Sequence, residues 1–216
     1  MSLAWLVRTR VDLCAATAYV QTQCAAPRAI DWSDLLHIVG YLESTPNYGI
    51  LIHVESLQPH VYIDAAWAVH RDRKSQSGAI VTAGPYGPPL MWKSSKQKVV
   101  AASSTEAELV ALSDFADLGL FMERLLDFLR IRVERPIPVF QDNTSTITVA
   151  YMGRPSLQAR RRFVDIRYFW LKQYLDSNTM VLRYLASKDM TADFLASIRS
   201  GADFVRFRFL TMGHQD

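Results

Sequence analysis

The sequence has only two cysteines, Cys14 and Cys24, ten residues apart in a segment with a helical pattern. This spacing fits neither a disulfide framework nor a zinc site, and it favours a reducing, intracellular compartment. No run of about 18 apolar residues occurs, and Arg8 and Arg10 interrupt the stretch that a signal peptide would keep apolar. We therefore expect a protein that is not secreted and does not bind membranes.

A large charge excess is also missing, because 24 Lys and Arg face 21 Asp and Glu, for a net charge of +3. That total is too small to indicate nucleic-acid binding by itself. A hydrophobic content of 50%, with 9 Gly and 9 Pro in 216 residues, excludes a disordered, collagen-like or coiled-coil chain. At this length we expect one large domain, or one domain of about 150 residues with an appendage, which would be residues 1–58.

The order of the predicted elements indicates an α/β fold with a mixed sheet. Apolar alternation predicts strands at residues 48–56, 60–69, 78–84, 90–100, 138–142 and 179–185. Helical spacing predicts helices at about residues 10–24, 31–43, 103–130, 161–175 and 190–198, with another beginning near 143. Asp31 or Ser33 could cap the second helix, and Ser103 with Glu106 forms a capping box before the third.

Four acidic residues stand at or near ends of these elements, where an α/β sheet usually assembles its site: Asp64, Glu108, Asp142 and Asp193. Carboxylates that converge repel one another and raise each other's pKa unless cations neutralise them. Their hard oxygen atoms select Mg²⁺ or Mn²⁺. Three of them also have a structural alternative: a solvated strand end for Asp64, a turn or helix cap for Asp142, and a favourable helix N-terminus for Asp193.

Glu108 is preferred over its neighbour Glu106 for geometric reasons. Two positions along a helix differ by about 200° of rotation, so both side chains cannot point at one metal. Glu106 already serves the capping box with Ser103, whereas Glu108 directly precedes an apolar run. We therefore predict Glu108 as the ligand.

Several motifs in a fixed order resemble the ribonuclease H domain of Ty1/copia retrotransposon polyproteins. They are VYIDAAWAVHRDRKSQSG (61–78), MWKSSKQKVVAASSTEAELVALSDFAD (91–117), VFQDNTSTITVA (139–150), VDIRYFWLKQYL (164–175) and SKDMTADFLAS (187–197). The preceding residues 1–58 resemble the thumb and connection end of the reverse transcriptase in those polyproteins. The resemblance implies a ribonuclease H-like, mixed five-stranded sheet with flanking helices over residues 59–198. A short helical segment in residues 1–58 would precede it, and a C-terminal tail over residues 199–216 would follow.

The same resemblance implies an enzyme that hydrolyses the RNA strand of RNA–DNA hybrids with four carboxylates and two Mg²⁺ ions, or Mn²⁺. By motif these ligands fall on Asp64, Glu108, Asp142 and Asp193. Asp64 would bridge both ions, with Glu108 and Asp142 on one and Asp193 on the other. The implied partners are the hybrid and other polyprotein products, in a cytoplasmic retrotransposon particle or the nucleus.

Substrate contacts are predicted from the charge distribution, because residues 154–172 carry six basic side chains against one acidic one. A solvated charged face is the alternative. The candidate substrate-binding residues are Lys93, Lys96, Ser104, Thr105, Asn143, Arg161, Arg162 and Arg167. We expect Trp92, beside Lys93, to pack against the long helix.

The sequence departs from the family pattern at several places. Ala66, Phe163 and Phe169 replace an Asp and two His, and LASIRSG (195–201) replaces the family's LTKPL. None of these changes removes a predicted metal ligand. They leave open a second hypothesis, a non-catalytic nucleic-acid-binding remnant of the same fold, and a third, a protein-interaction domain.

Overall fold

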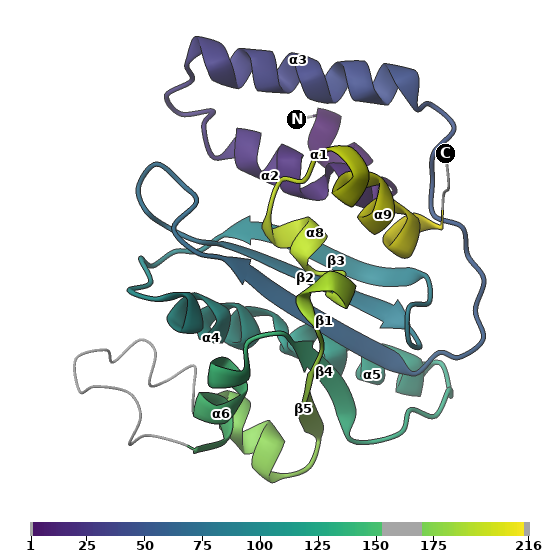
Figure 1. Ribbon diagram of the computed structural model, residues 1–216. Coiled ribbons are helices and arrows are strands. Elements are labelled where there is room, and N and C mark those ends of the chain that lie inside the picture. Colours follow the sequence, from purple (N-terminus) through teal and green to yellow (C-terminus); the bar gives the residue numbers. More distant parts are fainter. Residues whose placement is uncertain (1, 153–169, 214–216) are drawn as a thin grey trace.

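The computed structural model describes residues 2–152 and 170–213 (Figure 1). The described residues contain a five-stranded sheet of order β3-β2-β1-β4-β5. Its strands are β1 (Pro59–Ala66), β2 (Gln76–Ala83), β3 (Pro89–Lys96), β4 (Ile137–Gln141) and β5 (Met180–Tyr184). β2 pairs antiparallel with β1 and β3, whereas β4 runs parallel to β1 and β5. The predicted α/β class and mixed five-stranded sheet are confirmed.

Helices cover both faces of this sheet (Figure 1). Their bounds are α1 (Ser2–Leu6), η1 (Val11–Leu13), α2 (Cys14–Gln21), α3 (Ala29–Ser44), α4 (Ser104–Phe115), α5 (Asp117–Phe128), α6 (Thr144–Met152), η3 (Ser187–Asp189), α8 (Asp193–Ala196) and α9 (Gly201–Met212). Residues 170–176 are also helical. The main apolar core lies between the sheet and α4, α5 and α6, and a smaller one lies under α2, α8 and α9. No helix in the described ranges is long and apolar enough to cross a bilayer.

Several predicted boundaries were wrong. The strand expected at 48–56 is irregular chain, and its apolar residues Leu51 and Ile52 are exposed, so alternation there did not reflect burial in a sheet. The helix expected at 103–130 is divided at Ala116 into α4 and α5. The helix expected at 190–198 contains only the four residues of α8, because the backbone is extended from Ser197.

The expected helix caps were confirmed in part. Ser103 Oγ accepts the backbone N–H of Glu106 at 3.2 Å, while the Glu106 carboxylate accepts the N–H of Ala102 at 2.8 Å. α3 begins earlier than expected, and Asp31 lies within its first turn, where it accepts the N–H of Arg28 at 2.7 Å. Both helix starts therefore satisfy exposed backbone donors with nearby side chains.

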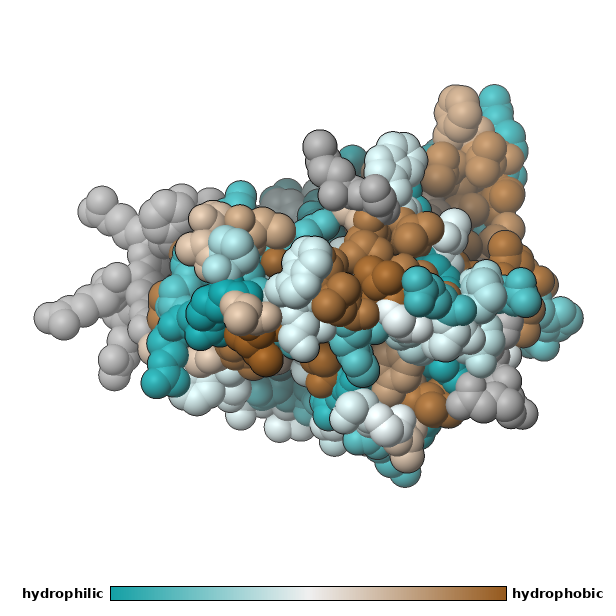
Figure 2. Space-filling view, turned by 90° about the horizontal axis from the view of Figure 1, so that it is seen from above, coloured by the Kyte–Doolittle hydropathy of each residue, from teal (hydrophilic) through white to brown (hydrophobic). Residues whose placement is uncertain are grey.

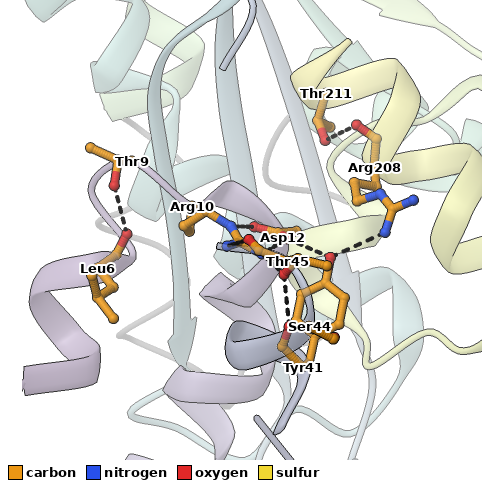
Figure 3. Close-up of polar contacts among 9 residues, drawn as sticks. All are labelled: Leu6, Thr9, Arg10, Asp12, Tyr41, Ser44, Thr45, Arg208 and Thr211. Atoms are coloured by element: carbon orange, nitrogen blue, oxygen red, sulfur yellow. Dashed lines mark hydrogen bonds and ion pairs between the residues drawn. The ribbon is translucent and has the colours of Figure 1, made fainter. Parts of the chain in front are cut away.

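A buried ion pair ties η1 to α3 and α9 (Figure 3). Arg10 donates to both carboxylate oxygens of Asp12 at 3.0 and 2.8 Å, and also to the carbonyl and hydroxyl oxygens of Thr45, each at 2.8 Å. Tyr41 donates to Asp12 at 2.7 Å and accepts from Arg208 at 3.2 Å. Residues 201–212, which we expected to belong to a tail, form the helix α9. Through Arg208 this helix is attached to the N-terminal unit, which we define as residues 2–44.

The N-terminal unit also packs on the sheet through Trp92. Its indole N–H donates to the carbonyl oxygen of Val7 at 2.8 Å, and its ring packs with the smaller core. The expectation that Trp92 packs against the long helix was wrong, because β3 directs this side chain to the opposite face. Figure 2, seen from above, shows hydrophobic residues at the surface on this side of the molecule, and Ile30, Trp32 and Leu36 of α3 are exposed.

We expect Arg10→Met to lower the free energy of unfolding by about 3 kcal/mol, because it leaves the buried Asp12 carboxylate without its cation. Chemical denaturation measures this loss. Arg8→Met is the matched control, since Arg8 is exposed and should change stability by less than about 0.5 kcal/mol. Equal losses in the two variants would contradict the importance of the buried pair.

We expect Gly78→Ala to destabilise the protein by about 2 kcal/mol, because β2 and α8 approach too closely for a side chain. A Cβ atom at Gly78 would lie 2.5 Å from the nitrogen of Ala196 and 2.6 Å from the carbonyl oxygen of Ala192. Gly40→Ala in α3 is the control: its Cβ meets nothing within 4 Å, and we expect it to stabilise the helix. Thermal unfolding of both variants tests the difference.

Candidate active site

Parallel pairing places two acidic residues at the same edge of the sheet. β1 and β4 are neighbours in register, so Asp64 near the end of β1 lies beside Asp142, which directly follows β4. α4 packs across β1 and supplies Glu108 from its buried face. Carboxylate oxygens of Asp64, Glu108 and Asp142 lie within 4.8 Å of one another. We call these three residues the carboxylate triad.

Burial and like charge shift the acidity of this triad. Asp64 and Glu108 are 7% and 5% exposed. Burial raises the pKa of Asp64, and the nearby charges of Asp193 and Asp142 raise it further. Burial also raises the pKa of Glu108, with further contributions from Asp64 and Asp142. The folded protein therefore pays a cost for ionising the triad, which a bound cation would offset.

Asp193 lies close enough to Asp64 to raise the pKa of Asp64. Asp193 itself is paired with a cationic side chain. Both of its carboxylate oxygens contact the guanidinium of Arg199. The Ser197 hydroxyl donates to Asp193 Oδ1 at 2.9 Å. The structure thus brings three predicted carboxylates together and places the fourth beside them in an ion pair.

Sequence reasoning missed Gln141, the last residue of β4, which is fully buried. Its side-chain amide donates to Glu108 at 3.1 Å, while its oxygen accepts the backbone N–H groups of Asp142 and Asn143 at 2.8 and 3.2 Å. Gln141 therefore orients two members of the triad. A polar residue at the end of an apolar strand, directly before Asp142, was the available signal.

Ser187 of η3 was also missed. Its hydroxyl donates to Asp142 Oδ2 at 2.7 Å, from a position 45 residues along the chain. Because that contact depends on how β5 and η3 fold back on β4, no local pattern indicates it. Arg199 was also missed, because its pairing with Asp193 depends on how the chain turns after α8.

The predicted substrate-binding residues have varied surroundings. Lys93 is exposed, with its ammonium 5.3 Å from the centre of the Phe115 ring, and Lys96 pairs with Asp72 at 2.9 Å. Asn143 Oδ1 accepts the N–H of Thr146 at 3.0 Å and so caps α6. Ser104 and Thr105 lie in the first turn of α4. Arg161, Arg162 and Arg167, together with Phe163 and Phe169, lie outside the described residues.

The chain is similar to parts of larger proteins. No family model matches it. The retrovirus-related Pol polyproteins from transposons RE1 and RE2 of Arabidopsis thaliana are 32% and 30% identical to it over 181 residues, which make up 83% of this chain and 12% of each polyprotein. Secreted RxLR effector protein 161 of Plasmopara viticola is 37% identical over 111 residues, covering 50% of this chain and 77% of that protein.

Among solved structures, a ribonuclease H1 named LC11-RNase H1, isolated from compost, is similar to 64% of this chain and to 92% of its own chain. The sequence identity is 17% and the TM-score is 0.44.

Without a divalent cation, we expect stability to fall as pH rises above the ordinary carboxyl range near pH 4, because the folded state holds protons on Asp64 and Glu108 that the unfolded chain releases. Glu108→Gln should reduce this decline and raise the free energy of unfolding at pH 8 by at least about 1 kcal/mol. Denaturation in EDTA between pH 5 and 8 measures both effects.

The control for this experiment is Glu106→Gln, two positions away on the same helix. Glutamine can keep the capping contact of Glu106, so this variant should follow the wild-type pH dependence. A wild-type stability that increases between pH 5 and 8 would show that the triad does not resist ionisation.

Proposed function

We propose that this chain, which belongs to the family of the retrovirus-related Pol polyproteins of transposons, is a ribonuclease H that cuts the RNA strand of RNA–DNA hybrids with divalent metal ions. The observation that carries the proposal is the carboxylate triad, with atoms within 4.8 Å of one another. Within this proposal, residues 59–198 form the nuclease domain, and residues 1–58 derive from the end of the reverse transcriptase.

The donor set fits a hard dication. Three carboxylates converge on one point, and burial and like charge raise the pKa of Asp64 and Glu108. Oxygen ligands of this kind select Mg²⁺ or Mn²⁺. Asp64, Glu108 and Asp142 would hold one ion, and Asp64 with Asp193 a second. Bound there, the two ions would supply an activated water and stabilise the leaving oxygen.

The residues around the triad have positioning roles in this account. Gln141 holds the Glu108 carboxylate by donating to it, and Ser187 does the same for Asp142. Fixed ligands reduce the reorganisation needed when phosphate charge develops.

Binding of the hybrid is proposed to rest on phosphate contacts with little sequence readout. Lys93 is exposed on β3, and Ser104, Thr105 and Asn143 flank the triad in sequence or space. Arg161, Arg162 and Arg167 are proposed to extend this contact. Other products of the same polyprotein remain proposed partners.

A non-catalytic nucleic-acid-binding protein is the second candidate function. The ion pair between Asp193 and Arg199 favours it, because a ligand that is already neutralised holds a second metal ion less readily. Ala66, in place of the family's second Asp, points in the same direction. The two candidates share the fold and differ in turnover.

The test is incubation of the purified chain with an end-labelled RNA–DNA hybrid and Mg²⁺. We expect cutting of the RNA strand alone, and at least a hundredfold loss of rate in Asp64→Asn, because that variant removes the charge shared by both ions. Asp176→Asn, an exposed carboxylate outside the triad, serves as the control and should keep full activity. A DNA duplex of the same sequence should not be cut.

Binding of the hybrid without cutting, in wild type and Asp64→Asn alike, would support the non-catalytic candidate. Cutting that is equally fast in Asp64→Asn would indicate a contaminating nuclease.

A further inference from the structure

We propose that Arg199 acts as an internal cation that competes with the second divalent ion for Asp193. This inference rests on the proposed function and deepens it. The triad would then fill first, and the second ion would bind only when the guanidinium leaves Asp193. Arg199 would thereby set the concentration of metal at which both positions are occupied.

The four carboxylates differ in the side chains that contact them. The side-chain hydrogen bonds recorded for Glu108 and Asp142 come from the neutral groups Gln141 and Ser187. Asp193, in contrast, receives a full positive charge on both oxygens from Arg199. An arginine that contacts both oxygens of a carboxylate occupies the side from which a metal ion would approach it.

The influence of this guanidinium extends beyond its partner. The charge of Arg199 lowers the pKa of Asp64, opposing the effect of the neighbouring carboxylates. It therefore acts on the residue that would bridge both ions. A monovalent group in this position would perform part of the charge compensation that a second divalent ion supplies.

A cavity beside Arg199 offers its side chain a second position. Its side chain also lines a cavity of about 480 Å³ that is bounded by residues of α3, α8 and α9, including Tyr41 and Phe204. Asp203 in α9 exerts a second electrostatic attraction on the guanidinium. Arg199 can therefore leave Asp193 through a side-chain rotation toward α9, with no movement of the sheet.

The competing residue lies where this sequence differs from its family. Ser197 and Arg199 both belong to LASIRSG, the segment that replaces the LTKPL pattern. Both side chains bind Asp193. The replacement leaves Asp193 in place and supplies both of these partners.

Titration of the full chain with Mn²⁺, followed by the electron paramagnetic resonance of the free ion, tests the proposal without measuring activity. We expect wild type to bind one ion tightly and a second weakly. Arg199→Gln should bind the second ion at least about tenfold more tightly and the first ion with little change. Adding Asp193→Asn to Arg199→Gln should remove this gain.

Arg206→Gln is the matched control, because Arg206 is an exposed arginine of α9 whose acidic partner is Asp189 and not Asp193. It should bind Mn²⁺ as wild type does. Circular dichroism confirms that each variant is folded. If Arg199→Gln is unfolded, Arg199→Lys provides the same comparison, with a smaller expected gain because lysine keeps a positive charge beside Asp193.

Equal affinity of wild type and Arg199→Gln for the second ion would overturn the proposal and leave the nuclease function standing. Failure of all variants to bind any Mn²⁺ would overturn the metal site itself, and both proposals with it.

Discussion

Repulsion among carboxylates is the constraint that organises this molecule. Asp64, Glu108 and Asp142 converge within 4.8 Å although two of them are almost fully buried. A cluster of this kind lowers stability when it ionises, so packing elsewhere must hold it together. The parallel contact between β1 and β4, with α4 lying across β1, provides that support. The stability lost at this edge of the sheet is the cost of the metal site that we propose there.

The helices on the opposite face of the sheet contribute to the site indirectly. α8 lies against β2 at Gly78, and this close approach positions Asp193 near Asp64. Beyond α8, the chain turns into α9, which binds the N-terminal unit through Arg208 and Tyr41. The N-terminal unit therefore supports the segment that carries Asp193 and Arg199. A part of the chain that is remote from these two residues in sequence thus contributes to their position.

Local patterns predicted much of the fold. Val61 and Ile63 alternate along β1, and Ser103 marks the start of α4, so both elements were found within a few residues. The false strand at 48–56 shows where alternation fails, because no neighbouring strand pairs with it in the described structure. The contact between Gln141 and Glu108 could not be predicted, since it joins segments that meet only in the folded chain, and the pairing of Arg199 with Asp193 depends on the turn after α8. The catalytic roles of the four carboxylates stay predictions.

Crystals of the chain soaked in Mn²⁺ would test the central claim most directly, through the anomalous scattering of the bound ion. The account predicts a peak coordinated by oxygens of Asp64, Glu108 and Asp142 at about 2.1–2.3 Å. A map without a peak at the triad, under conditions where Mn²⁺ is in excess, would contradict the claim that this edge of the sheet is a metal centre.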